Sequence, residues 1–303
     1  MNAPTVTTPT LGICTPSPQF GTPSGIIGTH RGLSATEFDA FQVASMELGR
    51  FRRKRQLLEL VYLNLQSYRS VMAELTSQFL ANPAVTFERA NSMVVRINCE
   101  LLNILSAVRT FVDHAETALK REYGKEAQQV TDFKKAASGE FDGDFSYRFM
   151  SQLRNFTQHC GLPLGELRLN ASSDPPSSEV RAGTLEALFL RDYLLTNFDG
   201  WKMVKEELAK MPDKFPVEPH LEQVVASVAR IDNTLVRIQG ADLDRHLTFL
   251  ESLAKEVEHL PGSPCVYTSI TPIPGGANTN FQRIHLDVLR SVREQLAQVR
   301  SGS

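Results

Sequence analysis

The chain has 303 residues, of which 42% are apolar and 22% are charged, and its formal net charge is −2. Such a composition is typical of a globular protein with one large domain or two modest ones. A nearly neutral chain has no overall field that attracts nucleic acid, so a polyanion would need a local basic patch. No apolar run reaches the ~18 residues of a membrane-spanning helix. The N-terminus lacks the basic start and apolar block of a secretory signal.

The four cysteines are widely spaced and form no C-x-x-C pair: Cys14, Cys99, Cys160 and Cys265. This spacing favours free thiols in a reducing compartment over a disulfide framework or a zinc site. The histidines outside the motif described below are scattered and lack the spacing of metal ligands. We therefore expect a cytoplasmic protein that binds no metal and no cofactor and does not enter a membrane.

The first ordered element is expected at residue 34. Residues 1–33 are rich in Thr, Pro, Gly and Ser and show no hydrophobic period, which predicts a disordered leader. Ser34 and Glu37 have the spacing of a capping box, and a helical pattern follows to about residue 82. A second helix is expected over residues 87–123, antiparallel to the first because the loop between them is short.

After a loop that carries Gly139 and Gly143, the pattern predicts a helix over residues 145–160. Two short apolar stretches, 165–169 and 184–190, flank a polar turn and predict a β-hairpin. Further helices are expected over residues 201–210, 219–239, 242–260 and 281–300, with a loop over 261–280 that contains a short strand at 265–270. The sequence thus predicts a mostly α protein, in which a helical bundle over residues 34–163 precedes a hairpin and a second helical region over residues 164–303.

The candidate catalytic motif lies at the end of the helix expected over residues 145–160, and its sequence is Arg154-Asn155-Phe156-Thr157-Gln158-His159. It places a guanidinium, a carboxamide and an imidazole within six residues. Arginine neutralises phosphate with a planar fork of donors, and histidine exchanges protons near neutral pH. Together these groups could cleave RNA without a metal ion.

The pattern Arg154-Asn155-x-x-x-His159 resembles the signature of the HEPN superfamily, in which Arg precedes His by four to six intervening positions. The preceding run, residues 103–114, is similar to uncharacterised bacterial proteins of that group. The resemblance covers about residues 35–163 and implies an up-and-down four-helix core. Many members are metal-independent endoribonucleases of toxin–antitoxin or antiphage systems, and others are non-catalytic. The resemblance therefore implies RNA as the substrate, a homodimer, and an antitoxin or defence protein as a partner.

In such a site, neutral His159 would accept the proton of a ribose 2′-hydroxyl, and the resulting alkoxide would attack the adjacent phosphate. The products would be a cyclic phosphate and a 5′-hydroxyl. Arg154 would stabilise the charge on the equatorial oxygens, an effect of about 2.7–4 kcal/mol for comparable donors. Asn155 would orient the imidazole or the phosphate.

Helix geometry complicates this assignment. At ~100° per residue, Arg154 and His159 lie roughly 140° apart around a regular helix, whereas Asn155 and His159 share a flank. Two resolutions are open: the helix unwinds near Gly161, or two protomers face each other and Arg154 of one serves His159 of the other. In a regular helix, Arg148 is a substitute for Arg154.

Two further groups of residues have both a functional and a structural interpretation. On the second helix, a polar row either supports Arg154 and His159 or is a solvated face, and it consists of Asn103, Ser106, Thr110 and Asp113. Arg109 and Asp113 have the spacing of an ordinary i, i+4 ion pair. The basic cluster either follows an RNA backbone or is solvated, and it consists of Arg52, Arg53, Lys54 and Arg55.

The motif itself also has a structural interpretation, in which its Arg and His satisfy the last carbonyls of the helix. Two functions therefore stay open: a HEPN-like ribonuclease, and a non-catalytic helical protein for dimerisation, sensing or scaffolding.

Overall fold

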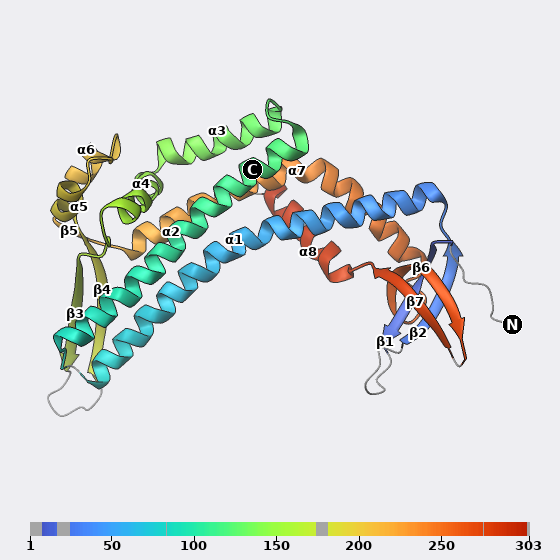
Figure 1. Cartoon of the computed structure of the whole chain (residues 1–303), viewed down its shortest axis with the longest axis horizontal. Coiled ribbons are helices and arrows are strands. Elements are labelled where there is room, and N and C mark those ends of the chain that lie inside the picture. Colours follow the sequence, from blue (N-terminus) through green and yellow to red (C-terminus); the bar gives the residue numbers. More distant parts are fainter. Residues whose placement is uncertain (1–7, 17–24, 83, 174–180, 275, 302–303) are drawn as a thin grey trace. The chain divides into compact units, whose positions relative to one another are not determined.

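A computed structural model of the chain (Figure 1) describes residues 8–16, 25–82, 84–173, 181–274 and 276–301. These residues are mostly helical and form two small antiparallel sheets, which confirms the predicted mostly α class. No helix in the described ranges is both long and apolar enough to cross a membrane. The chain divides into two compact units. We call residues 54–235 the central unit, and residues 1–53 with 236–303 the terminal unit.

Long helices dominate the central unit. They are the second part of α1 (Ala35–Ala81), the whole of α2 (Phe87–Tyr123) and the first part of α7 (Glu218–Glu256). An ion pair joins Lys54, in the first half of α1, to Glu122 at the end of α2, and a second joins Glu74, near the end of α1, to Arg96 near the start of α2. These two helices are therefore antiparallel, as predicted (Figure 1).

A shorter helix, α3 (Gln128–Gly143), occupies the segment that was predicted to be a loop. The prediction of a loop was based on Gly139 and Gly143, and it is wrong because the helix includes both glycines. Val130 and Phe133 are buried, and this burial offsets the cost of about 0.5–1 kcal/mol for a glycine inside a helix. Gly139 lies where an added Cβ would meet no atom within 4 Å, so the backbone there faces open space.

The predicted hairpin is confirmed as β3 (Glu166–Ser173) and β4 (Arg181–Leu190), which pair antiparallel with Leu169 opposite Leu185. A third strand, β5 (Lys214–Pro216), pairs with β4 and completes the sheet. Two short helices lie between β4 and β5. The first, α5 (Arg191–Asn197), was not predicted, and the second, α6 (Val204–Ala209), is shorter than the helix expected over residues 201–210.

An aromatic cluster joins this sheet to α4 (Phe145–His159), the helix that carries the motif. Phe149 lies at its centre and is fully buried. Its ring stacks on Trp201 with a centroid distance of 5.7 Å and meets Phe189 edge-on at 5.3 Å. Aromatic pairs of this geometry stabilise a fold beyond the effect of their buried area. The cluster therefore fixes one face of α4 against the sheet.

The terminal unit contains a four-stranded antiparallel sheet in the order β2-β1-β6-β7. The prediction of a disordered leader over residues 1–33 is wrong for β1 (Thr10–Pro16) and β2 (Gly25–Gly32). Besides β2, β1 pairs with β6 (Ser263–Ile273), which lies near the other end of the chain. Leu11 and Ile13 of β1 are buried in the core of the unit. Residues 1–7 and 17–24, also in the predicted leader, lie outside the described residues.

Helices cover the rest of the terminal-unit core. The predicted capping box is confirmed, because Ser34 Oγ accepts a hydrogen bond from the Glu37 N–H and the Ser34 N–H donates to the Glu37 carboxylate. Two helices were predicted over residues 219–260, but α7 is continuous through Gly240. An added Cβ at Gly240 would lie 3.5 Å from Leu296 of α8 (Leu286–Ser301), so packing against α8 supports the helix at this glycine.

The last strand and helix differ in one further respect from the sequence prediction. The strand expected at residues 265–270 is confirmed within β6, but the helix expected from residue 281 begins at Leu286. Residues 281–283 belong instead to β7 (Gly276–Arg283), which pairs with β6. The predicted division into residues 34–163 and 164–303 also differs from the two units, since α1 and α7 each contribute to both.

The aromatic cluster generates a stability prediction. Phe149→Ala removes a fully buried ring, so we expect it to lower the free energy of unfolding by about 3–5 kcal/mol. Phe87→Ala is the matched control, because Phe87 is 87% exposed, and it should change that energy by no more than about 0.5 kcal/mol. Urea denaturation monitored by circular dichroism measures both. Equal losses in the two variants would contradict the assignment of Phe149 to the core.

Candidate functional site

The position of α4 is set at its first turn. Asp144 caps the helix, because its side chain accepts a hydrogen bond of 2.8 Å from the Tyr147 N–H. The other carboxylate oxygen of Asp144 accepts a hydrogen bond of 2.6 Å from the side chain of Gln223 on α7. A single carboxylate therefore satisfies the helix terminus and ties it to a long helix of the same unit.

Arg148 fixes the corner between α3 and α4. Its buried guanidinium donates to the carbonyls of Phe141 and Asp142, at 2.7 and 2.6 Å, at the end of α3. It also forms a two-pronged ion pair with Glu207 of α6, at 3.1 and 2.6 Å. These four bonds use four of the five guanidinium N–H groups, so only one is left for a ligand. Arg148 was predicted as a substitute for Arg154, but its donors are already occupied by the fold.

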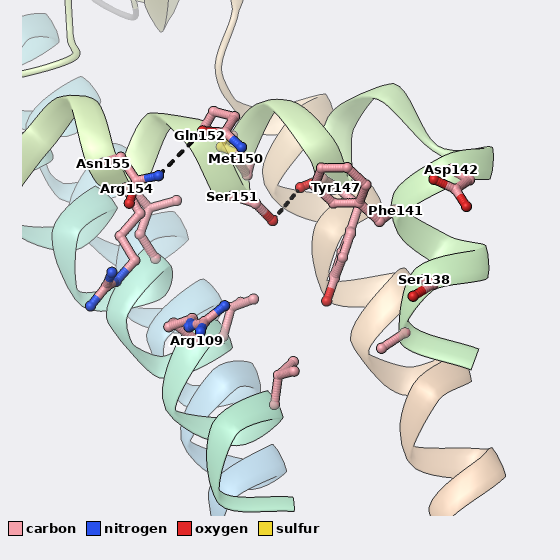
Figure 2. Close-up of a pocket in the computed structure, with 14 residues that line it drawn as sticks. Arg109, Ser138, Phe141, Asp142, Tyr147, Met150, Ser151, Gln152, Arg154 and Asn155 are labelled. Carbon is pink, nitrogen blue, oxygen red and sulfur yellow. Dashed lines mark hydrogen bonds between the residues drawn. The ribbon is translucent and has the colours of Figure 1, made fainter. Parts of the chain in front are cut away.

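An open cleft of about 530 Å³ lies between α2, α3 and α4. Its lining is mixed, with apolar side chains from α2 and polar side chains concentrated on α4. Figure 2 shows the Arg154 side chain extending from α4 toward α2, where Arg109 lies. The lining residues with the greatest capacity to bind a ligand are Arg109, Tyr147, Ser151, Gln152, Arg154 and Asn155.

Arg154 brings an unsatisfied donor to this cleft. Its Nη1 donates a long hydrogen bond of 3.3 Å to the Gln158 side chain, while its Nε is buried and has no hydrogen-bond partner among the residues that the structure describes. Arg109 donates to Asp113 at 2.7 Å, and Asn155 donates to Gln152 at 3.2 Å (Figure 2). Buried donors are nearly always paired, so the Nε–H of Arg154 is a donor that the fold leaves unsatisfied. It becomes available to a ligand in the cleft only when the side chain rotates and exposes it.

His159 lies apart from the cleft. It is the last residue of α4, it is exposed, and it does not line the cleft. The helix stays regular through this residue, because Cys160 follows as its C-cap and donates to the Phe156 carbonyl at 2.8 Å. Of the two predicted resolutions, unwinding near Gly161 therefore fails, since the backbone departs from the helix only after His159. Within one chain the structure brings Arg154 and Asn155 together but not His159.

Most of the polar row on α2 lies away from the cleft and does not support Arg154 or His159. Asn103 and Ser106 are exposed and do not line the cleft. Asp113 acts indirectly, through its ion pair with Arg109. Arg109 was predicted only as half of that pair, whereas in the structure it also lines the cleft. A signal was present on α4, where Tyr147, Ser151 and Asn155 recur every four residues and line one face.

Half of the predicted basic cluster is occupied by ion pairs. Lys54 pairs with Glu122, and Arg55 pairs with the buried carboxylate of Asp232. Arg52 and Arg53 are exposed and have no acidic partner within the described part of the chain. Two of the four predicted RNA-binding residues therefore remain available to a ligand.

His220 of α7 supports the start of α4. Its Nδ1 lies 2.8 Å from Ser146 Oγ, and the rings of Phe145, Phe149 and Phe215 surround it. Burial lowers the pKa of His220 below its usual value of 6.5, although the Asp144 carboxylate acts in the opposite direction. The imidazole is therefore neutral in the folded protein at neutral pH.

This burial generates a pH prediction. Because the unfolded chain takes up a proton at His220 more readily than the folded protein, stability should fall as the pH drops below about 6.5. His220→Gln removes the titration and keeps an amide near Ser146. Melting temperatures at about pH 7.5 and about pH 5.5 should therefore differ less in this variant than in the wild type. His114→Gln, at an exposed site, is the control; equal pH dependence in wild type and His220→Gln would disprove the effect.

Comparisons with known proteins identify no relative. No family model, no curated protein and no solved structure matches the chain. In the ranges that the structure describes, no group of three or more His, Cys, Asp or Glu side chains is placed to hold a metal ion. The interpretation of the cleft therefore depends on its own residues, above all on the two arginines and the separate histidine at the end of α4.

Proposed function

We propose that the protein is a HEPN-like, metal-independent endoribonuclease whose active site is completed by a second copy of the chain. The observation that carries this proposal is the unpaired, buried Nε of Arg154 in a cleft that also contains Arg109 and Asn155. A phosphate oxygen in the cleft would satisfy that donor once the Arg154 side chain rotates to expose it. Exposed His159, on the same helix, supplies an imidazole, the side chain that most often acts as a general base.

The second copy is needed because one chain cannot join the two groups. Arg154 and His159 lie roughly 140° apart around the regular helix α4. A two-fold axis near the end of α4 would place His159 of each protomer at the cleft of its partner. His159 has no hydrogen bond or ion pair to any described residue, so it is available for such a contact.

The chemistry of this composite site follows from its donors. Neutral His159 accepts the proton of a ribose 2′-hydroxyl, and the oxygen attacks the adjacent phosphorus while the bond to the 5′-oxygen breaks. The 5′-oxygen takes a proton from the imidazolium or from water, which leaves a 2′,3′-cyclic phosphate and a 5′-hydroxyl. Arg154 stabilises the charge on the phosphate oxygens. Asn155 positions the phosphate.

The biological setting of this proposal comes from the resemblance of the Arg154–His159 motif to the HEPN superfamily. A ribonuclease of this kind would act in the cytoplasm as a toxin or an antiphage effector. Its partner would then be an antitoxin or another defence protein. The HEPN-type arrangement of four helices is part of the same proposal.

A second candidate function is a non-catalytic helical protein for dimerisation, sensing or scaffolding. The position of His159 favours it, because this residue does not line the cleft that holds Arg154. In that case the cleft binds an anionic ligand and performs no chemistry.

Incubation of the purified protein with RNA in EDTA tests the catalytic proposal. We expect fragments with cyclic phosphate and 5′-hydroxyl ends. His159→Ala should reduce the cleavage rate by roughly 10²–10⁴-fold, and Arg154→Ala should reduce it by roughly 10²–10³-fold.

His114→Ala is the matched control for this assay, because His114 is an exposed histidine of the same unit that lies outside the cleft. It should cleave RNA at the wild-type rate. Absence of cleavage by the wild type, or full cleavage by His159→Ala, would reject the ribonuclease and leave the non-catalytic function.

A further inference from the structure

The terminal unit contains a second, smaller pocket, separate from the cleft of the proposed ribonuclease. Residues from α1, α7, β7 and the start of α8 enclose a volume of about 100 Å³. A single water needs only ~10–15 Å³ of such space, so the pocket has room for a larger group. Its floor is apolar and consists of Leu48, Leu250, Ile284 and Leu289, all buried.

The rim of this pocket is cationic. Arg52 comes from α1, Arg283 from β7, and His285 from the residue before α8, and these side chains are exposed. The hydroxyl of Ser45 and the amide of Gln282 add two further donors. No carboxylate lines the pocket. The rim therefore presents hydrogen-bond donors of positive charge above an apolar floor.

The acidic residues nearest in sequence to the rim do not neutralise these cations. Glu47 on α1 is bound by Arg50, and Asp287, in the first turn of α8, does not line the pocket. Arg283 lies over the ring of Phe281 at 5.7 Å, a contact that leaves its N–H groups free for an anion. Arg52 and His285 form no ion pair with any described residue.

Helix α8 adds to the positive potential of this rim. The helix has 16 residues and starts at Leu286, directly after His285 of the pocket. The N–H groups of its first turn have no partner within the helix, and its dipole favours a negative charge at this end. The contribution of α8 supplements the two guanidinium groups and does not replace them.

We propose that this pocket binds the phosphoryl group of a phosphomonoester. Guanidinium groups on two sides suit the several oxygens of a terminal phosphate, which arginine binds through paired hydrogen bonds. The volume accommodates that group and excludes an attached sugar or base, which would remain outside the rim. The ligand is either a small free phosphomonoester or the 5′-phosphate of an RNA, and the site is independent of RNA cleavage in the central unit.

Isothermal titration calorimetry of the full-length protein tests the proposal with three probes: inorganic phosphate, a 5′-phosphorylated oligoribonucleotide and the same oligonucleotide with a 5′-hydroxyl. Saturable binding of inorganic phosphate supports a site for free phosphate compounds. Binding of the phosphorylated oligonucleotide alone assigns the site to an RNA end. Absence of binding by all three, or equal binding of both oligonucleotides without phosphate binding, would overturn the proposal.

Matched variants locate the binding. Arg52→Gln and Arg283→Gln should each weaken phosphate-dependent binding at least about tenfold, as expected when a charge-assisted hydrogen bond is lost. Arg290→Gln removes the same charge from an exposed position of α8 that does not line the pocket, and it should bind like the wild type. An equal loss in all three variants would show a general electrostatic effect and overturn the proposal.

Gly49→Met tests the cavity without changing charge. Gly49 lines the pocket, and an added Cβ would contact only the guanidinium of Arg53, at 3.5 Å. Helix α1 should therefore accept the substitution, and the longer side chain should fill the space. We expect loss of binding with an unchanged melting temperature. Wild-type affinity in this folded variant would place the anion elsewhere and overturn the proposal.

Discussion

The candidate cleft depends on the corner between α3 and α4, which the buried guanidinium of Arg148 holds together. This side chain donates to the last carbonyls of α3 and pairs with Glu207 of α6, so three helices meet at one cation. Asp144 caps α4 at the same corner, and His220 supports its first turn. Because these groups are satisfied within the fold, α4 is a fixed support for the side chains on its exposed flank.

Helix α4 has three roles on three sides. Phe149, Leu153 and Phe156 are fully buried and hold it in the core. The polar flank of Arg154 and Asn155 faces the cleft, and exposed His159 ends the helix. A regular helix keeps the arginine and the histidine on different flanks. Chemistry that needs both groups therefore requires a second chain, whereas binding of an anion by Arg154 and Arg109 does not.

The sequence was most informative where structure is local. Hydrophobic periodicity predicted α1, α2, α4 and the β3–β4 hairpin, since each pattern lies within its own segment. The pairing of β1 with β6 was missed because its partner lies about 250 residues away, beyond any local pattern. The position of Arg109 in the cleft was not predicted because α3 forms one wall of that cleft. The glycines of α3 had led to the prediction of a loop in its place. Arg148 is held by an ion pair with Glu207, which lies 59 residues further along the chain. The spacing of residues on α4 therefore could not predict this pair.

We propose that Arg154 of one protomer serves His159 of its partner. Inactive Arg154→Ala and His159→Ala proteins, mixed in equal amounts and allowed to exchange subunits, test this directly. Half of the dimers are then mixed and each has one intact composite site, so RNA cleavage should recover to about a quarter of the wild-type rate. Mixed dimers that form, as shown by mass spectrometry, but do not cleave RNA would contradict a composite site.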